Sequence, residues 1–267
     1  MISKIILYVD NLSYIDEYRE VGVSTFLFAL KDYCVGYNTN TLGEINNVKV
    51  SNKFVLINRV LESKDIDKLK ELLPKLKVDG IIFEDVGLLH LVKELKLNIK
   101  MILFQNHFNT NSSSVNFWLD RVDSVLISNE LTSNEIKTIC SNAKKPIVLN
   151  LYGYNQVMYS RRLLLSNWSE EFNIPYKNNN LIEDVATHVR FRALENDYGT
   201  VMYSDKIFNG KELLGLDNVL YYYVNSMMID HDEIIKYLAN LNRDLLDCED
   251  EGFLDKPTIY KLKERNK

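Results

Sequence analysis

Eight short stretches of this chain are almost continuously apolar, and they limit its fold more than any other feature. They cover residues 4–9, 24–30, 53–59, 79–85, 99–105, 123–128, 145–151 and 217–226. Strands with one face in water alternate apolar and polar residues, whereas strands covered on both faces are apolar throughout. Segments with helix signals separate the first seven stretches. The pattern therefore predicts parallel strands that are joined by helices.

The helix signals lie in the segments between these stretches. Ser13 to Asp16 and Thr132 to Glu135 both fit the capping-box pattern that begins a helix. Residues 65–77 place leucines at helical spacing, and Pro74 is expected to kink or end that helix. Gly22 stands where the first helix is expected to stop.

Parallel strands with helical crossovers form either a doubly wound sheet or a (β/α) barrel. The doubly wound fold usually carries a glycine-rich phosphate turn after its first strand, and residues 10–13, Asp-Asn-Leu-Ser, contain no glycine. We therefore expect an α/β fold of the (β/α) barrel type, similar to a TIM barrel. Residues 167–210 break the rhythm and predict a small antiparallel β insertion late in the chain.

Length and composition favour a single soluble domain over residues 1–267. Apolar residues make up 46% of the chain, the net charge is −5, and no low-complexity linker interrupts it. No apolar run reaches the length of a signal peptide core or a membrane helix, and three scattered cysteines do not form a disulfide framework. We expect a cytoplasmic protein without a membrane partner, with a charged tail over 249–267 that frays.

Polar side chains follow successive strands at the point where each strand ends. In a barrel of this kind the active site is built at the carboxyl ends of the strands. Exposed loops are polar in any protein, so a merely solvated rim is the alternative. No catalytic residue or metal ligand is assigned, because the sequence lacks HExxH, GxSxG, a Walker glycine loop and paired CxxC. The candidate binding residues are Lys31, Arg59, Glu84, Asp85, Asn106, His107, Asn129, Glu130, Arg161 and Arg162.

Two adjacent arginines, Arg161 and Arg162, raise a separate question, because neighbouring guanidinium groups repel one another and resist burial. Carboxylate partners, a bound anion or peptide ligand, and plain solvent are the three possible reasons for their presence. We predict that at least one of them points into the barrel mouth. It would form a bidentate pair there with Glu84, Asp85 or Glu130.

Several segments also resemble a known family. They are FLFALKDYCVGYN, DGIIFEDVGLLHLVKEL, NTNSSSVNFW, SVLISNELTSNEI and GYNQVMYSRRLLLS. They occur in the order seen in the collagenase-like peptidase family of unassigned catalytic type, family thirty-two, and the resemblance covers about residues 1–245. It implies a barrel and a nominal hydrolase, a peptidase.

The sequence departs from the signature of that family. The signature has the form HGxxCxxxxGxC, and Tyr152, Gln156, Arg161 and Leu163 stand at its His, Cys, Gly and Cys positions. In relatives that hydroxylate RNA or quinone precursors, such cysteines are associated with an iron–sulfur cluster, which requires four thiolates. This chain has three cysteines in all. The resemblance therefore implies a short, cysteine-free branch, and we predict no iron–sulfur cluster or other cofactor.

Three functions remain open from the sequence. The first is a peptidase-family barrel protein whose catalysis takes place at the strand-end mouth. The alternative is a non-catalytic or accessory paralogue that partners a longer, cysteine-bearing member or other RNA-modification machinery in tRNA or rRNA hydroxylation. The third is an enzyme that acts on a small anionic carboxylate or phosphate.

Overall fold

The eight apolar stretches form the eight parallel strands of a closed barrel. The computed structural model describes residues 1–256. The ring closes because β12 pairs with both β1 and β8. This confirms the predicted (β/α) barrel. Its strands are β1 (Ile5–Tyr8), β2 (Thr25–Leu30), β4 (Asn52–Ile57), β5 (Gly80–Phe83), β6 (Lys100–Phe104), β7 (Ser124–Leu126), β8 (Ile147–Ser160) and β12 (Val219–Asn225).

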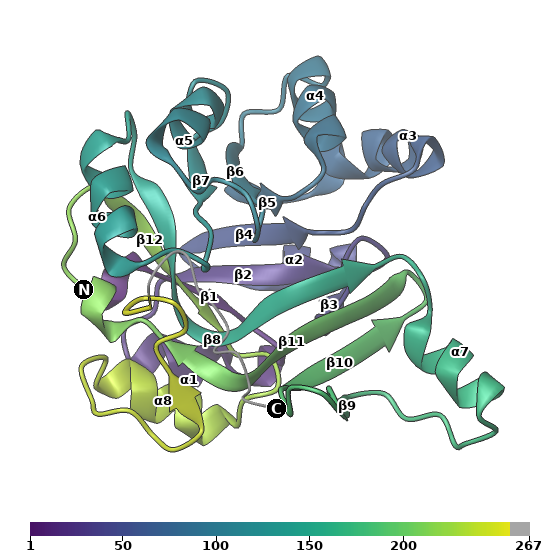
Figure 1. Cartoon of the computed structure of the whole chain (residues 1–267). Coiled ribbons are helices and arrows are strands. Elements are labelled where there is room, and N and C mark those ends of the chain that lie inside the picture. Colours follow the sequence, from purple (N-terminus) through teal and green to yellow (C-terminus); the bar gives the residue numbers. More distant parts are fainter. Residues whose placement is uncertain (257–267) are drawn as a thin grey trace.

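Helices connect most of the barrel strands and lie outside the ring (Figure 1). They are α1 (Ile15–Glu20), α2 (Leu42–Asn47), α3 (Ser63–Leu72), α4 (Val86–Glu94), α5 (Ser112–Leu119), α6 (Ser133–Asn142), α7 (Leu164–Glu171) and α8 (His231–Ala239). Short 3₁₀ turns cover Ile2–Lys4, Leu12–Tyr14, Leu73–Lys75 and Lys211–Leu213. Among the described residues, no helix is both long enough and apolar enough to cross a membrane.

The helix signals were partly right. Thr132 and Glu135 form the expected capping box at the start of α6. The helix α3 ends at Leu72, two residues before Pro74, as predicted. The capping box predicted from Ser13 is wrong, because α1 begins at Ile15 and no side chain caps it. The side-chain oxygen of Asn11 accepts both the backbone N–H and the hydroxyl of Ser13, so that hydroxyl is already engaged.

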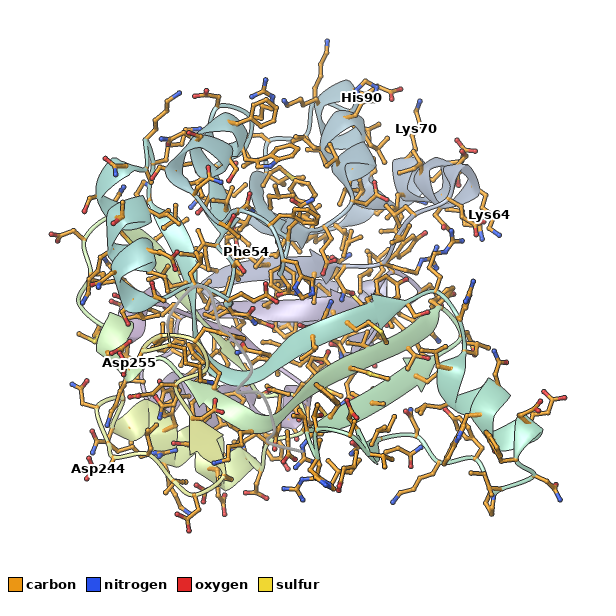
Figure 2. The ribbon with its side chains drawn as sticks, in the orientation of Figure 1. Phe54, Lys64, Lys70, His90, Asp244 and Asp255 are labelled. Carbon is orange, nitrogen blue, oxygen red and sulfur yellow. The ribbon has the colours of Figure 1, made fainter. Side chains whose placement is uncertain are left out.

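The barrel interior is filled in layers. Inward side chains from six strands, among them Leu27, Ile82 and Phe104, surround one small space below the mouth. Phe54 lies deeper, with its ring edge-on to Tyr221, and Figure 2 shows it inside the molecule. A layer of buried tyrosines closes the interior above: Tyr8, Tyr37, Tyr203 and Tyr223. The barrel is therefore a packed core, and a ligand can reach only its mouth.

The strand β8 does not stop at the barrel rim but runs on to Ser160. Its outer part pairs with β11 (Gly199–Asn209), which pairs with β10 (Arg190–Asn196) and then β9 (Asn180–Glu183). These strands form an antiparallel ribbon across the barrel, and α7 lies beyond its far end (Figure 1). Two further short strands are β3 (Thr39–Asn40) beside β2 and β13 (Glu249–Asp250) beside β11.

The segment after α8 is held against the ribbon by a buried charge network. Glu249 is 4% exposed and accepts hydrogen bonds from Tyr152, Asn209 and Arg243. These partners hold the pKa of Glu249 below its usual value against the opposing effect of burial. The fraying predicted over residues 249–267 is wrong for residues 249–256, because β13 pairs with β11 there and Leu254 is buried. Residues 257–267 lie outside the described residues, and for them the fraying stays a prediction.

Candidate active site at the barrel mouth

A pocket of about 260 Å³ lies at the carboxyl ends of three neighbouring barrel strands. Residues after β4, β5 and β6 form its walls, and β8 lies across it and contributes two side chains. It is lined by Arg59, Val60, Glu84, Asp85, Gln105, Asn106, His107, Phe108, Gln156 and Tyr159. Loops that follow parallel strands open at the same end of the barrel, so residues distant in sequence meet here.

Glu84 is the residue of this pocket whose pKa the surroundings change most. It follows β5 in the position after Phe83, and it faces inward like Ile82 because side chains alternate along a strand. Its Oε1 atom is fully buried and has no hydrogen-bond partner among the described residues. Burial raises the pKa of this carboxyl to about 8, because the charged form loses its hydration. Near neutral pH, Glu84 therefore holds a proton that it can exchange.

Two buried amides share the pocket with Glu84. Asn106 is 6% exposed and Gln156 is 8% exposed, and each has an amide atom without a hydrogen-bond partner. Within the described residues, seven buried side-chain nitrogen or oxygen atoms lack a partner, and three of them belong to residues that line this pocket. Buried polar groups are normally paired, so this concentration indicates a place where a ligand supplies the missing bonds.

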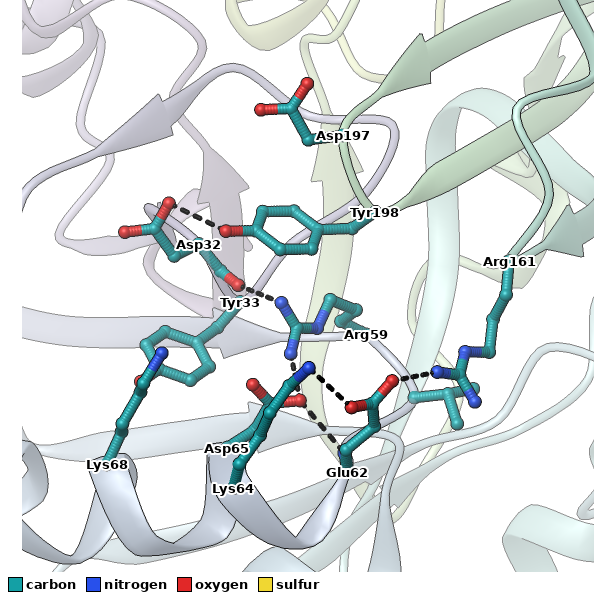
Figure 3. Close-up of a pocket in the computed structure, with 11 residues that line it drawn as sticks. Asp32, Tyr33, Arg59, Glu62, Lys64, Asp65, Lys68, Arg161, Asp197 and Tyr198 are labelled. Carbon is teal, nitrogen blue, oxygen red and sulfur yellow. Dashed lines mark hydrogen bonds and ion pairs between the residues drawn. The ribbon is translucent and has the colours of Figure 1, made fainter.

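Arg59 separates this pocket from a second cavity of about 490 Å³ and lines both. Its guanidinium is buried, forms an ion pair with Asp65 of α3, and donates to the backbone oxygen of Asp32 at 2.7 Å. The ring of Tyr198 stacks on it, with 4.2 Å from Cζ to the ring centre (Figure 3). With Asp65 and Tyr198 as neighbours, Arg59 is a fixed part of the wall rather than a mobile cation.

His107 and Glu130 form a pair at the outer edge of the pocket. Nδ1 of His107 lies 3.1 Å from Oε1 of Glu130, and both side chains are more than two-fifths exposed. Phe108, the next residue, also lines the pocket and is 65% exposed. A histidine with a carboxylate partner can relay a proton, but it lies at the rim here rather than beside the buried atoms.

Comparison with known proteins gives the family. The model of peptidase family U32 matches residues 39–219, which is more than half of the chain. The chain belongs to peptidase family U32. The match includes β4 to β11 and all ten residues that line the pocket beside Glu84.

The relatives of this U32 chain say little more about its activity. An uncharacterized protease of Methanocaldococcus jannaschii is 34% identical over 131 residues, which are 46% of this chain. The chain covers 31% of the length of that relative. The spore cortex-lytic enzyme SleL of Bacillus cereus matches with a TM-score of 0.44 and 10% identity, over 88% of this chain and 73% of that structure. The C-terminal domain of a chitinase-like protein of Desulfitobacterium hafniense matches with a TM-score of 0.39 and 12% identity, over 90% of this chain and 100% of that structure. TM-scores this low do not support an inference about function.

Five of the ten candidate residues line the pocket, namely Arg59, Glu84, Asp85, Asn106 and His107. Glu130 joins them through His107. Asp85 has a structural task in addition, because its carboxylate caps α4 at Gly87 and holds the backbone N–H of Leu61. Asn129 lines a different small cavity, and Lys31 is exposed and does not line the pocket.

The prediction for the arginine pair is wrong. Arg161 and Arg162 are both exposed, and neither pairs with Glu84, Asp85 or Glu130. Arg161 forms an ion pair with Glu62 instead, and no ion pair is found for Arg162 among the described residues. The prediction assumed that the seventh strand ends near Leu151, whereas β8 continues for nine more residues and carries the arginines away from the rim.

Besides Val60, Gln105 and Phe108, which adjoin predicted residues in the sequence, two more pocket residues were missed, Gln156 and Tyr159. Both lie on the part of β8 beyond the barrel rim, which the apolar pattern did not reveal. One signal did exist for Gln156, since it occupies the first cysteine position of the family signature. The loss of that cysteine indicates only that a metal ligand is missing, and the length of β8 decides that the replacing amide enters the pocket.

The cysteines do not fit an iron–sulfur cluster. Gln156 and Leu163 occupy the signature positions, and the three cysteines present lie on separate elements. Burial raises the pKa of the Cys34 thiol to about 12, and the thiol donates to the backbone oxygen of Leu56, so it is a packed side chain and not a nucleophile. Among the described residues, no three His, Cys, Asp or Glu side chains come together as a metal site would require.

Proposed function

We propose that this U32 barrel hydrolyses peptide bonds in the mouth pocket, with Glu84 as the residue that moves the proton. One observation carries the proposal. A buried carboxyl of raised pKa and two buried amides with unpartnered atoms line the same pocket. Perturbed titratable groups and unpaired polar atoms in one concave site are typical of catalysis. Family membership adds the substrate class, a peptide.

The chemistry assigned to Glu84 is general base and then general acid. As the carboxylate, it removes a proton from a water molecule while the water oxygen forms a bond to the scissile carbonyl carbon. It then returns the proton to the amide nitrogen as the carbon–nitrogen bond breaks, so that a carboxylic acid and an amine leave. A base with a pKa near 8 accepts a proton far better than an ordinary carboxylate, and it still ionises in a useful pH range.

The role we assign to the amides of Asn106 and Gln156 is to stabilise the oxygen of the tetrahedral intermediate. An amide NH₂ group donates two hydrogen bonds, and the Nδ2 atom of Asn106 has no partner among the described residues. The amide of Gln156 can turn about its last torsion and present either its oxygen or its NH₂ group. Donors held in a dry site before the reaction begins stabilise the developing negative charge more than water does.

The test is hydrolysis of gelatin and of a defined peptide mixture, followed by mass spectrometry. We expect cleavage by the wild-type chain and a loss of about 100-fold or more in the Glu84→Gln variant. Glu94→Gln is the matched control, because it makes the same replacement at the last residue of α4, where Glu94 pairs with Lys70 and does not line the pocket. The proposal fails if no peptide is cleaved, or if Glu84→Gln cleaves as fast as Glu94→Gln.

The other expectations from the sequence remain proposals. The matched curated relative is named as a protease, and neither this name nor the family description supports the RNA-modification alternative. A cytoplasmic location is likewise proposed from the sequence, and cell fractionation tests it. The chain covers less than a third of the curated relative, so the activity of that longer protein is no guide to how this chain selects its peptides.

A further inference from the structure

A second cavity adjoins the pocket of Glu84 and has a different character. It measures about 490 Å³ and shares Arg59 and Val60 with that pocket. An extended ligand that reaches Glu84 can therefore continue past Arg59 into this space. The cavity is bounded by the start of α3, the end of β8 and the turn between β10 and β11 (Figure 3).

Basic side chains dominate the side of the cavity formed by α3 and β8. Lys64 and Lys68 stand one turn apart on α3, and Arg161 reaches in from the end of β8. The single carboxylate between them is that of Glu62, which pairs with Lys64 at 2.8 Å and also with Arg161. Lys68 has no ion pair among the described residues. Lys64 and Arg161 thus share one carboxylate while Lys68 has none, and the positive end of the α3 dipole adds to the field of these three cations.

The lining as a whole carries four cationic and four acidic side chains, but the acids other than Glu62 are held elsewhere or lie away from the exposed cations of the α3 side. Asp65 is occupied by the buried guanidinium of Arg59. Asp32 accepts the hydroxyl of Tyr198 at 3.0 Å, on the opposite side of the cavity. The carboxylate of Asp197 points away from the other labelled side chains (Figure 3). The α3 side therefore keeps a positive charge that faces the path of a ligand.

We propose that this cavity is a subsite for a carboxylate of the substrate, held by Lys64, Lys68 and Arg161. The inference rests on the proposed peptide substrate and adds its selectivity. The carboxylate belongs either to an aspartate or glutamate side chain or to the free C-terminus of the peptide, and both present the same planar anion. A guanidinium and two ammonium groups bind such an anion, whereas a basic residue placed here meets like charge.

The test measures binding rather than cleavage, so that it stands apart from the test of catalysis. All proteins carry Glu84→Gln to prevent turnover. Fluorescence anisotropy compares labelled peptides of one length that contain a central Glu, Gln or Lys, each with an amidated or a free C-terminus. We expect at least one carboxylate peptide to bind about tenfold more tightly than its neutral counterpart, with the advantage falling as salt rises. Comparison of the central Glu with the free C-terminus identifies the source of the carboxylate.

The location is tested with the double variant Lys64→Gln/Lys68→Gln, which should lose that advantage. The matched control is Lys70→Gln, because Lys70 lies on the same helix but pairs with Glu94. The inference is wrong if neutral peptides bind as well as carboxylate peptides, or if the double variant keeps the full preference. Selective binding without hydrolysis by the wild type would retain the subsite and reject the proposed catalysis. Absence of binding by every peptide rejects both.

Discussion

The buried carboxyl of Glu84 should destabilise the folded protein as the pH rises. Its pKa is 4.5 without the protein environment and about 8 in the folded state. Between these values the unfolded chain releases the proton and the folded chain keeps it, so the free energy of unfolding falls with increasing pH. Below 4.5 both states are protonated and the contribution is fully present. Above about 8 both are ionised and the loss is complete.

Glu84→Gln removes this loss, because a glutamine is neutral at every pH. Each pKa unit corresponds to about 1.4 kcal/mol, so the stability of the variant relative to the wild type should grow by about 2.5 kcal/mol between pH 5 and 7. The gain should reach about 4 kcal/mol by pH 9, where the curve flattens. These figures are ceilings, since any water that enters the pocket hydrates the carboxylate and reduces the penalty. The proposed function requires the same variant to lose hydrolysis, so under that proposal stability and activity oppose each other at this residue.

Urea unfolding at pH 5, 7 and 9, followed by circular dichroism, measures the difference at each pH. Glu94→Gln serves as the control, because Lys70 lowers the pKa of that exposed carboxylate and any dependence on pH should have the opposite sign. A difference between Glu84→Gln and the wild type that is equal at pH 5 and pH 9 would refute the reasoning. It would mean that Glu84 is hydrated or paired in solution, and its role as a base of raised pKa would be lost.

Three further predictions concern the frame of the site. Arg59→Leu leaves Asp65 buried without its ion-pair partner and should lower the free energy of unfolding in urea by about 3–5 kcal/mol. A loss below about 1 kcal/mol would contradict the buried pair. Arg161→Leu and Arg162→Leu should each change stability by less than about 0.5 kcal/mol, and a larger loss in thermal unfolding would show that an arginine is buried after all. Gly153 has φ of 129°, and a Cβ there would lie 2.6 Å from a backbone oxygen. Gly153→Ala should therefore lower the free energy of unfolding by more than about 1 kcal/mol, and an unchanged melting temperature would count against this geometry.

The sequence by itself determined the barrel and the end at which the pocket beside Glu84 lies. Strands buried on both faces must be apolar along their whole length. The local composition therefore predicts the number of strands and their order along the chain. Parallel strands all open at one end, and polar residues such as Glu84, Asn106 and His107 could therefore be assigned to one mouth before any coordinates were known. Arg59 followed from the same rule.

Only the tertiary structure decided which charges meet and how Glu84 behaves. The length of β8 depends on pairing with β11, some forty residues later in the chain. Local composition did not reveal that Gln156 reaches the pocket or that Arg161 is carried away from it. Likewise, Asp65 rather than a residue of the mouth holds Arg59. The pKa of Glu84 is raised because the packed fold buries its carboxyl, and Oε1 has no hydrogen-bond partner among the described residues. Burial is a property of the packed fold and not of any single segment of sequence.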